Sequence, residues 1–521
     1  MTARKFPQMF LLFFLTLRRK LCNSFLLRRK PSNMRNITRV YKTEEFSNQT
    51  LIFHFEGALL RSNSLFPYFM LVAFEAGGFL RSLVLFLSYP LVWLVGEDQL
   101  GLKIMIFLSF FGIKKESFKI ERAVLPKFFL EDVRLEGFEV IMSCERKIAV
   151  SDLPKIMVEG FLKEYFGVEA VVASEMKLVC GYFVGLIEET KAKDIMLDEI
   201  LGEGKAGCNA IGIGCYNKYL DQQLFSRCKE IYHVSNAEKR NGHSLPREKY
   251  PKPLIFHDGR LAFRPTPIAS LAMFMWIPLG FFISIIRFTL GALLSFRMSA
   301  PILALTGTRA TVTTPGSCLS TTEEKEKGVL YVCNHRTLLD PLYVAFVLSK
   351  PVSTVTYSLS RFSEVTSPIK AIPLTRDRER DRNIMKNLLC EGNIVVCPEG
   401  TTCREPYLLR FSPLFAELAD DIVPVALDVK VTMFYGTTAS GRKCLDPIFH
   451  LLNPNPAYSI KFLEKLPGSY TCKAGTKSSI EIANYVQSEI AKALGFQCTS
   501  YTRKDKYMIL AGNEGIVRSH C

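Results

Sequence analysis

The sequence lacks Cys-x-x-Cys pairs, and its 15 cysteines are scattered singly along 521 residues. This pattern excludes a zinc site of the usual spacing and a disulfide framework, and it is typical of reduced thiols that face the cytosol. A nucleic-acid-binding motif is also missing. The excess of Lys and Arg over Asp and Glu, 66 against 50, therefore indicates phosphorylated small molecules or an acidic membrane surface as partners.

Acidic residues are absent from the first 43 residues, which carry 11 Lys and Arg between short apolar runs. The main basic clusters follow the apolar run at 9–15, and no small-residue cleavage site is evident, so the pattern disagrees with a secretory signal. We predict that residues 1–47 form a basic interfacial anchor. The alternatives are a mitochondrial transit peptide, because the segment is rich in arginine, and a disordered tail.

Uncharged runs of membrane-spanning length are scarce. The runs at 82–95 and 104–113 are too short to cross a bilayer, and they predict buried helices or helices that rest on a membrane. Residues 268–286 are uncharged throughout, and we predict a membrane segment at 265–297. Pro278 near its middle favours a hairpin over a single tilted span, with a pair of core helices as the other alternative.

The rest of the sequence predicts two α/β domains, at 48–250 and 300–500. The second domain alternates helix-like segments with strand-like runs. These runs lie at 329–333, 354–359, 394–397 and 422–429. An amphipathic helix is expected at 478–494. We expect residues 501–521 to be a polar tail whose sequence indicates little about structure or function.

A buried strand runs into a turn that contains His335 and Asp340 (VLYVCNHRTLLDP, residues 329–341). On a regular helix these two side chains would lie about 140° apart, so a turn has to bring them together. Asp340 followed by Pro341 suits the start of a helix. A carboxylate that orients a histidine is the arrangement of a general base, and the alternative is a histidine that only caps a turn.

Three further blocks follow in order: LTRDRERD at 374–381, VVCPEGTT at 395–402 and IVPVAL at 422–427. Together with the first block, they resemble the four ordered motifs of glycerolipid acyltransferases, and most closely those of the land-plant glycerol-3-phosphate acyltransferases. The resemblance is strong over residues 300–460. It implies an acyltransferase α/β domain in which His335 is the catalytic base.

The resemblance and the residue chemistry together predict the substrate contacts. Arg376 and Arg378 can offer paired donors to a phosphate, with a solvated, ion-paired helix start as the alternative. Many relatives carry arginine directly after Gly-Thr in the third block, where this sequence has Thr402, so Arg404 or Arg410 is expected to replace it. The expected substrate-binding residues are Arg376, Arg378, Glu399, Gly400, Thr401, Arg404, Arg410 and, at the end of the acyl-CoA groove, Pro424.

The segment TLIFHFEGALL, residues 50–60, resembles the first motif of haloacid-dehalogenase-type phosphatases without its chemistry. That motif uses two aspartates beside magnesium, and His54 and Glu56 take their places here. Ser151 matches a phosphate-binding position and Cys215 replaces a metal-binding aspartate, while Asp221 matches a second acidic position at a longer spacing. We predict a degenerate domain with a helical cap and no phosphatase activity.

These observations predict a membrane-bound enzyme that transfers an acyl group from acyl-CoA to glycerol 3-phosphate, with no cofactor, no metal and no nucleic-acid partner. The alternatives are lysophosphatidate acylation and a catalytically silent lipid-binding scaffold. The endoplasmic reticulum is the expected location, with a mitochondrial membrane as the alternative. The resemblance also implies acylation at sn-2 and a role in cutin or suberin lipids, although the sequence itself leaves the acylated position open.

Overall fold

The computed structural model describes residues 34–36, 49–97, 100–188, 210–215, 228–294, 296–315, 328–357, 367–419, 421–440, 443–472 and 477–514, with residues 195, 197 and 200. It divides into two units, the first formed by residues up to 254 with 264–271 and the second by 255–263 with the chain from 272 onward. Apart from residues 34–36, the predicted anchor lies outside the described residues. Asp221 lies outside them as well.

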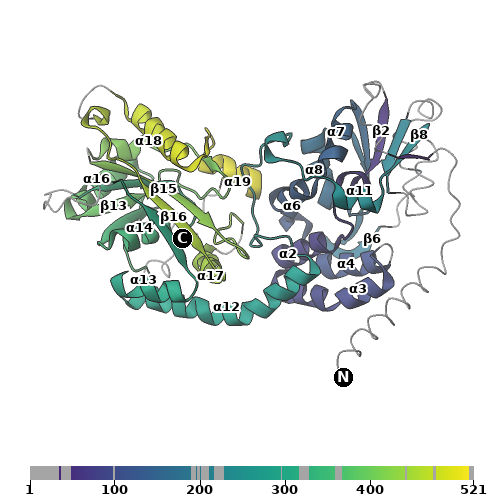
Figure 1. Ribbon diagram of the computed structural model, residues 1–521, viewed down its shortest axis with the longest axis horizontal. Coiled ribbons are helices and arrows are strands. Elements are labelled where there is room, and N and C mark those ends of the chain that lie inside the picture. Colours follow the sequence, from purple (N-terminus) through teal and green to yellow (C-terminus); the bar gives the residue numbers. More distant parts are fainter. Residues whose placement is uncertain are drawn as a thin grey trace. The chain divides into compact units, whose positions relative to one another are not determined.

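The first unit is built on a parallel sheet, of which β2 and β8 are labelled in Figure 1. Its strand order is β1-β8-β7-β2-β3-β4. The strands are β1 (Met34–Asn36), β2 (Thr50–His54), β3 (Arg146–Val150), β4 (Ala170–Val172), β7 (Ala210–Gly214) and β8 (Glu230–His233). Leu51, Ile52 and Phe53 of β2 are all buried, because both faces of a central parallel strand are covered. Since parallel strands end at one edge, the residues that follow β2, β3 and β7 lie close together.

Helices and one hairpin complete the first unit, and the chain between β2 and β3 supplies the predicted helical cap. The helices are η3 (Phe55–Leu59), α2 (Phe66–Leu87), α3 (Tyr89–Val95), α4 (Leu100–Phe110), η4 (Lys115–Ser117), α5 (Ile120–Ala123), α6 (Leu125–Asp132), α7 (Leu135–Met142), α8 (Lys155–Phe166), α11 (Asn236–Asn241) and η5 (Arg247–Lys249). The hairpin pairs β5 (Met176–Val179) with β6 (Tyr182–Ile187). It packs against α4, where the Phe110 and Phe183 rings meet edge to face at 5.6 Å.

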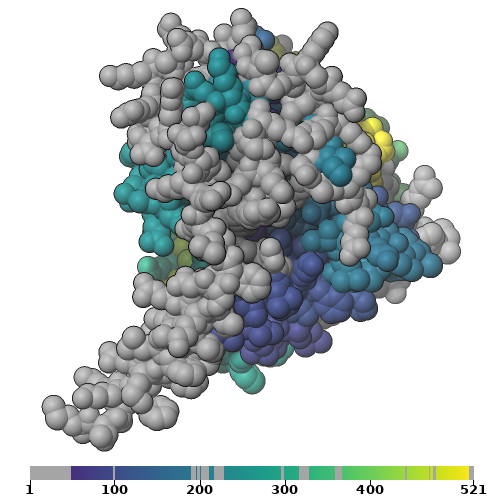
Figure 2. All heavy atoms as spheres, turned by 90° about the vertical axis from the view of Figure 1, so that its right-hand side faces the viewer, coloured from purple at the N-terminus to yellow at the C-terminus, as the bar shows by residue number. Residues whose placement is uncertain are grey.

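The cap exposes large apolar side chains on α2, α3, α4 and the hairpin, which we call the cap surface. Its members that are at least half exposed are Leu80, Val84, Leu87, Leu91, Leu100, Phe111, Val179 and Leu186. Figure 2 shows part of this surface, in purple-blue for the cap helices and in lighter blue for the hairpin. Exposed apolar side chains gathered on one part of a fold are typical of a protein or membrane contact.

The second unit is built on a seven-stranded sheet with the order β12-β11-β13-β10-β15-β16-β9. Its neighbours are parallel except for β15 and β16. The strands are β9 (Arg309–Thr313), β10 (Leu330–Cys333), β11 (Val352–Thr356), β12 (Lys370–Pro373), β13 (Asn393–Val396), β15 (Ile422–Lys430) and β16 (Ala457–Phe462). A separate pair joins β14 (Tyr407–Leu408) and β17 (Gln497–Cys498). The predicted strands are thus confirmed to within a few residues.

Helices cover both faces of this sheet, because alternate residues of each strand point to opposite sides. Leu330 and Val332 pack with α16 and α18, whereas Cys333 packs with α14 on the other face. The helices are α12 (Pro267–Leu293), whose residues from 272 onward belong to this unit, α13 (Phe296–Leu305), α14 (Asp340–Leu348), α16 (Arg378–Glu391), η6 (Pro413–Glu417), η7 (Lys443–Leu445), α17 (Asp446–Leu451), η8 (Gly468–Tyr470), α18 (Ser479–Leu494) and α19 (Arg503–Ala511). The predicted polar tail therefore includes a helix, α19.

The predicted hairpin in the apolar segment is wrong, because α12 is one continuous helix of 27 residues that runs through Pro278. A side chain at Gly280 would meet the Trp276 indole at 2.6 Å, so the glycine makes room for that ring and does not form a turn. The indole nitrogen in turn donates to the Leu452 carbonyl at 2.8 Å. By length and composition, α2 and α12 are the two described helices that could cross a membrane.

Candidate active site

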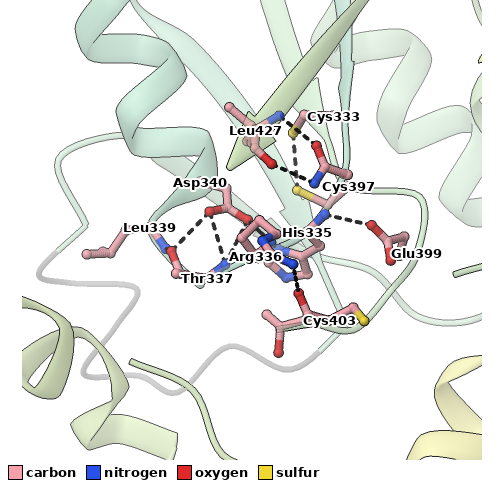
Figure 3. Close-up of polar contacts among 12 residues, drawn as sticks. Cys333, His335, Arg336, Thr337, Leu339, Asp340, Cys397, Glu399, Cys403 and Leu427 are labelled. Atoms are coloured by element: carbon pink, nitrogen blue, oxygen red, sulfur yellow. Dashed lines mark hydrogen bonds and ion pairs between the residues drawn. The ribbon is translucent and has the colours of Figure 1, made fainter. Parts of the chain in front are cut away.

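His335 directly follows β10, a central strand of the second sheet (Figure 3). The side chain of the preceding residue, Asn334, continues the pairing with β15: its amide donates to the Leu427 carbonyl at 2.9 Å and accepts from the Leu427 N–H at 2.7 Å. The backbone is therefore anchored immediately before the histidine.

The turn after His335 brings Asp340 back to it, as predicted. His335 Nδ1 lies 2.9 Å from Asp340 Oδ2. The buried carboxylate also accepts from the N–H groups of Arg336 at 2.5 Å and Thr337 at 2.9 Å, and from the Tyr458 hydroxyl at 3.2 Å. These donors fix its position, so it can hold the imidazole in one orientation and one tautomer. α14 begins at Asp340 without a side-chain cap. The Asp340 carboxylate therefore accepts hydrogen bonds from the turn that precedes the helix and does not cap the helix itself.

Cys397, at the end of β13, is the other polar neighbour of the His335 ring. Burial lowers the pKa of His335, but contacts with Cys397 and Asp340 outweigh burial and raise it above its ordinary value. The Cys397 and Cys333 sulfur atoms lie 3.4 Å apart on adjacent strands. This hydrogen bond and burial hold the pKa of Cys397 well above the usual range for a thiol. A raised pKa disfavours the thiolate, which is the nucleophilic form of cysteine.

The loop of the third block wraps around the backbone of His335. Glu399 accepts from the His335 N–H at 2.7 Å and from the Leu409 N–H at 3.0 Å, and the Cys403 N–H donates to the His335 carbonyl at 2.8 Å. Burial raises the pKa of Glu399 to about 7. The carboxylate thus holds the loop and the histidine together. Gly400 turns the chain with a φ of 65°, which a residue with a side chain rarely adopts.

A cavity of about 560 Å³ opens beside His335 and Cys397. Apolar parts of its wall come from α12, α13 and α14, through residues such as Phe288, Leu303 and Phe346. Polar parts come from the third-block loop and from the C-terminal elements. The lining residues from these parts are Gly400, Thr401, Thr402, Lys443, Arg503, Lys506 and Tyr507. The cavity therefore suits a ligand with a long apolar part and an anionic group.

The two arginines predicted in the second block lie outside the cavity lining. Arg378 is mostly exposed and forms an ion pair with Glu417. Arg376 is exposed, and its φ of 70° is set by Asp381, whose carboxylate accepts from the N–H groups of Thr375 at 2.7 Å and Arg376 at 3.0 Å. A non-glycine residue held in this region is a strained position of the kind found at functional sites.

The other predicted substrate-binding residues outside the cavity lining are Glu399, Arg404, Arg410 and Pro424. Arg404 is buried away from the cavity, where it donates to Thr437 Oγ1 at 3.1 Å. Arg410 is exposed, and Pro424 lies in β15 opposite Val332. Of the predicted binding residues, Gly400 and Thr401 are the ones that line the cavity.

In the first unit, His54, Glu56, Ser151 and Cys215 gather at the edge where β2, β3 and β7 end. Glu56 Oε1 accepts from Ser151 Oγ at 2.5 Å and from the N–H groups of Asp152 at 3.1 Å and Leu153 at 3.0 Å. The Cys215 thiol donates to a backbone carbonyl, that of Val234, at 2.9 Å. A glutamate carboxylate thus accepts from Ser151, the residue that was expected at a phosphate-binding position, and from the two N–H groups that follow it.

Two family models match the chain. A model described as the HAD-like domain of RAM2-like glycerol-3-phosphate acyltransferases matches residues 50–234, and an acyltransferase model matches residues 318–430. Probable glycerol-3-phosphate acyltransferase 3 of Arabidopsis thaliana is 53% identical over 95% of this chain and 97% of that protein. The chain belongs to the plant glycerol-3-phosphate acyltransferase family.

Further relatives agree with this assignment. Glycerol-3-phosphate acyltransferase 1 of Arabidopsis thaliana is 47% identical over 89% of this chain and 81% of that protein, and RAM2 of Petunia hybrida is 44% identical over 89% and 97%. Among solved structures, the acyltransferase PlsC of Thermotoga maritima matches at a TM-score of 0.26, with 14% identity over 43% of this chain and 92% of PlsC. The predicted combination of an HAD-like domain with an acyltransferase domain is confirmed by the family models.

Magnesium, which the HAD-like fold implies, is poorly matched by this member of the family. Mg²⁺ binds oxygen ligands, whereas His54 offers an imidazole, Cys215 a thiol, and Glu56 has one oxygen occupied by three donors. Among the described residues, two groups bring three possible ligand atoms within 4.8 Å of one another: His54 with Glu56 and Asp152, and His335 with Asp340 and Cys397.

Two segments of this acyltransferase were missed by sequence reasoning. The first is α19, whose capping box of Thr502 and Asp505 is a helix-start signal readable from the sequence. The second is the segment at 255–263, left between the predicted domains. In it His257 Nε2 lies 2.8 Å from a carboxylate oxygen of Glu405, and Asp258 accepts from the Ser440 hydroxyl at 2.7 Å. Paired side chains this far apart in sequence leave no local signal.

Proposed function

We propose that this family member transfers an acyl group from acyl-CoA to a hydroxyl of glycerol 3-phosphate, with His335 as the general base. The observation that carries the proposal is the His335–Asp340 pair, 2.9 Å apart, whose histidine lines the cavity. His335 takes the hydroxyl proton as the oxygen bonds to the thioester carbonyl carbon. The carbon–sulfur bond then breaks, and the proton passes to the departing CoA thiolate. Positioning and proton transfer need no cofactor.

The apolar wall formed by α12, α13 and α14 is where we place the acyl chain. Phe288 and Ala292 on α12 line it together with Leu303 on α13. This wall stays in place because Arg287, which is almost fully buried in α12, donates to the carbonyls of Asn453 at 2.6 Å and Pro454 at 3.0 Å. A preformed apolar wall beside the base would bring the thioester to the reacting hydroxyl.

The test uses the purified enzyme with radiolabelled acceptors and several acyl-CoA donors. We expect glycerol 3-phosphate to be the preferred acceptor, and the position of the acyl group in the product reports sn-1 or sn-2. The preferred acyl-CoA donors show whether the products are of the kind used for cutin or suberin lipids. A preference for lysophosphatidate over glycerol 3-phosphate would contradict the proposal.

Replacing Cys397 separates direct transfer from a covalent route, because a thiol beside a His–Asp pair is also the arrangement of a nucleophile. We expect Cys397→Ala to retain at least about a tenth of the wild-type turnover, since the thiol only borders the base. The measurement is kcat with saturating substrates, with Cys390→Ala, an exposed cysteine, as the matched control. Loss of more than about 100-fold, with an acyl group trapped on the wild-type enzyme, would show that Cys397 carries the acyl group.

Membrane binding is proposed to use exposed apolar faces, one of them on α12. Met275, Leu279, Phe282 and Ile286 form a stripe at helical spacing and are between 49% and 71% exposed. The cap surface is a second such face. Helices of this kind can lie in the lipid interface. We place the enzyme at the endoplasmic reticulum, and fractionation decides between that membrane and a mitochondrial one.

Replacing Leu279, Phe282 and Ile286 together by serine is expected to release much of the enzyme from membranes at alkaline pH, because each change removes apolar contact with lipid. The measurement is the fraction left in the pellet after carbonate extraction. Ile480→Ser, a change at a 61% exposed residue on α18, is the control and should leave the pellet fraction unchanged. If the triple variant remains in the pellet like wild type, α12 is not the face that binds the membrane.

A further inference from the structure

The positive charges in the cavity come mostly from segments after residue 430, where the match to the acyltransferase model ends. Lys443 on η7 and Arg503 and Lys506 on α19 line the cavity, together with Arg287. Arg287 donates to backbone carbonyls. Asp446 is the one acidic residue among those that line the described cavity, and it lies 2.6 Å from Arg260.

Lys443, Arg503, Lys506 and Tyr507 form one connected group, which we call the α19 cluster. Lys443 Nζ donates to the Tyr507 hydroxyl at 2.5 Å, and the Arg503 guanidinium lies 4.9 Å from the centre of the Tyr507 ring. The aromatic ring thus holds two cations on one side of the cavity. Cations gathered on a partly desolvated wall favour an anionic ligand.

Lys506 connects the α19 cluster to the catalytic loop. Its Nζ donates to the Thr402 carbonyl at 2.5 Å and lies 3.2 Å from Thr402 Oγ1 and 3.4 Å from Thr401 Oγ1. These three contacts use the three hydrogens that the Lys506 ammonium group can donate. Lys506 therefore positions the loop and does not reach further into the cavity. The next residue of that loop, Cys403, donates to the His335 carbonyl.

The cluster is held at an electrostatic cost that an anion would relieve. Burial and the nearby charges of Arg404 and Lys443 lower the pKa of Lys506 to about 8, against the opposing charge of Asp258. Burial and the charge of Arg376 also lower the pKa of Arg503, which places the strained Arg376 within electrostatic range of α19. Like charges brought together in this way repel one another unless a ligand of opposite charge lies between them.

We propose that α19 forms the phosphate-binding part of the cavity, with Arg503 and Lys443 contacting a substrate phosphate and Lys506 positioning the Thr401–Thr402 loop. This assignment rests on the proposed function and supplies the cation that the third block lacks at Thr402. Two substrates carry phosphate, glycerol 3-phosphate as a monoester and CoA in its nucleotide. The loop contact beside His335 favours the acceptor, which has to bring its hydroxyl to the base.

The test compares Arg503→Gln with Lys504→Gln in the full-length enzyme. Both changes remove one positive charge from α19, but Lys504 is exposed and pairs with Glu514 at 2.7 Å. We expect Arg503→Gln to raise KM for glycerol 3-phosphate about 10- to 100-fold, the loss of a charged hydrogen bond, with KM for acyl-CoA unchanged. Lys504→Gln should leave both constants unchanged. Arg503→Lys, which keeps the charge, should lie between wild type and Arg503→Gln.

Lys506→Met is expected to raise KM for glycerol 3-phosphate and to lower kcat, because the loop next to His335 shifts. Its KM for acyl-CoA should stay near the wild-type value, a split that general destabilisation would not produce. A rise in KM for acyl-CoA alone in Arg503→Gln would support a phosphate site but assign it to CoA. If neither KM changes in Arg503→Gln, the proposal is overturned.

A binding measurement separates this inference from the proposed function. Glycerol 3-phosphate, CoA and inorganic phosphate are each added to detergent-solubilised protein, and the melting temperature is followed. We expect glycerol 3-phosphate to stabilise wild type and Lys504→Gln but not Arg503→Gln. A stabilisation that depends on Arg503, in a protein that does not acylate glycerol 3-phosphate, would keep the site and reject the function. Equal stabilisation of all three proteins would reject the site.

Discussion

His335→Ala and Asp340→Ala should each lower acyl transfer at least about 100-fold, the range that a positioned general base contributes. The imidazole of His335 lines the cavity and can take the hydroxyl proton. Asp340 Oδ2 holds its Nδ1 at 2.9 Å, so loss of the carboxylate frees the ring to rotate and to change tautomer. The measurement is the initial rate with radiolabelled glycerol 3-phosphate and saturating acyl-CoA.

Asp340→Asn should be nearly as severe as Asp340→Ala. Both carboxylate oxygens accept hydrogen bonds, Oδ2 from His335 and Arg336 and Oδ1 from Thr337 and Tyr458. The asparagine amide nitrogen cannot accept. In either orientation, the amide nitrogen of the asparagine therefore faces groups that also donate hydrogen bonds, either those of His335 and Arg336 or those of Thr337 and Tyr458.

The control for the histidine is His243→Ala, because the His243 side chain is 81% exposed in the first unit. It should keep wild-type turnover. The melting temperatures of all variants are measured in parallel, so that an unfolded variant is not mistaken for a folded variant that has lost catalytic activity. A correctly folded His335→Ala that keeps a tenth of the wild-type rate would remove His335 from the role of base.

Local sequence patterns were sufficient for four strands of the second sheet, β10, β11, β13 and β15, and for the proximity of His335 and Asp340. The strand before His335 is a short apolar run, and the turn to Asp340 follows because a regular helix could not bring the two side chains together. The amphipathic helix expected at 478–494 is α18, which begins at a capping box of Ser478 and Glu481. Each of these inferences depends on residues within one turn or one strand, where sequence spacing and spatial distance agree.

Contacts between distant segments were not readable in the same way. The charges of Arg376 and Arg378 suggested a phosphate site, but a sequence does not show where a side chain points, and Arg378 pairs with Glu417, 39 residues away. The cation beside the third block is Lys506, 105 residues beyond Thr401. Glu399 was expected to face the substrate and instead holds two backbone N–H groups.

The hairpin expected around Pro278 failed for a related reason. Proline removes one helical hydrogen bond and usually kinks or ends a helix, but neighbouring contacts can hold the helix through it. Here Trp276 is anchored to the Leu452 carbonyl at 2.8 Å, and Gly280 leaves space for its ring. The local signal for a turn was therefore overridden by packing against the catalytic domain.

The product of this enzyme is expected to keep its phosphate, so that lysophosphatidate accumulates and monoacylglycerol does not. Phosphatases of the HAD type need a carboxylate nucleophile and a second carboxylate as acid and base. Here His54 stands at the first position. At the second, Glu56 accepts hydrogen bonds from Ser151, Asp152 and Leu153. A phosphate would have to displace that carboxylate and lie against its negative charge.

Single substitutions that restore an acid should therefore rescue nothing. His54→Asp supplies a carboxylate, but Glu56 still occupies the donors that a phosphate needs. Cys215→Asp adds an oxygen ligand without a nucleophile. Lys239 Nζ holds the Glu56 carbonyl at 2.7 Å and the Ser62 carbonyl at 3.1 Å, so the turn that carries Glu56 is fixed from a second side.

The measurement is the lipid product from radiolabelled glycerol 3-phosphate and acyl-CoA, separated after incubation with inhibitors of other phosphatases. Wild type, His54→Ala and His54→Asp should all give lysophosphatidate with less than about 1% monoacylglycerol, since a site without its nucleophile loses orders of magnitude in rate. If wild type instead gives mainly monoacylglycerol and His54→Ala abolishes it, the first unit is an active phosphatase. In that case His54 has to act as the nucleophile, and the Glu56 carboxylate has to leave its three donors during turnover.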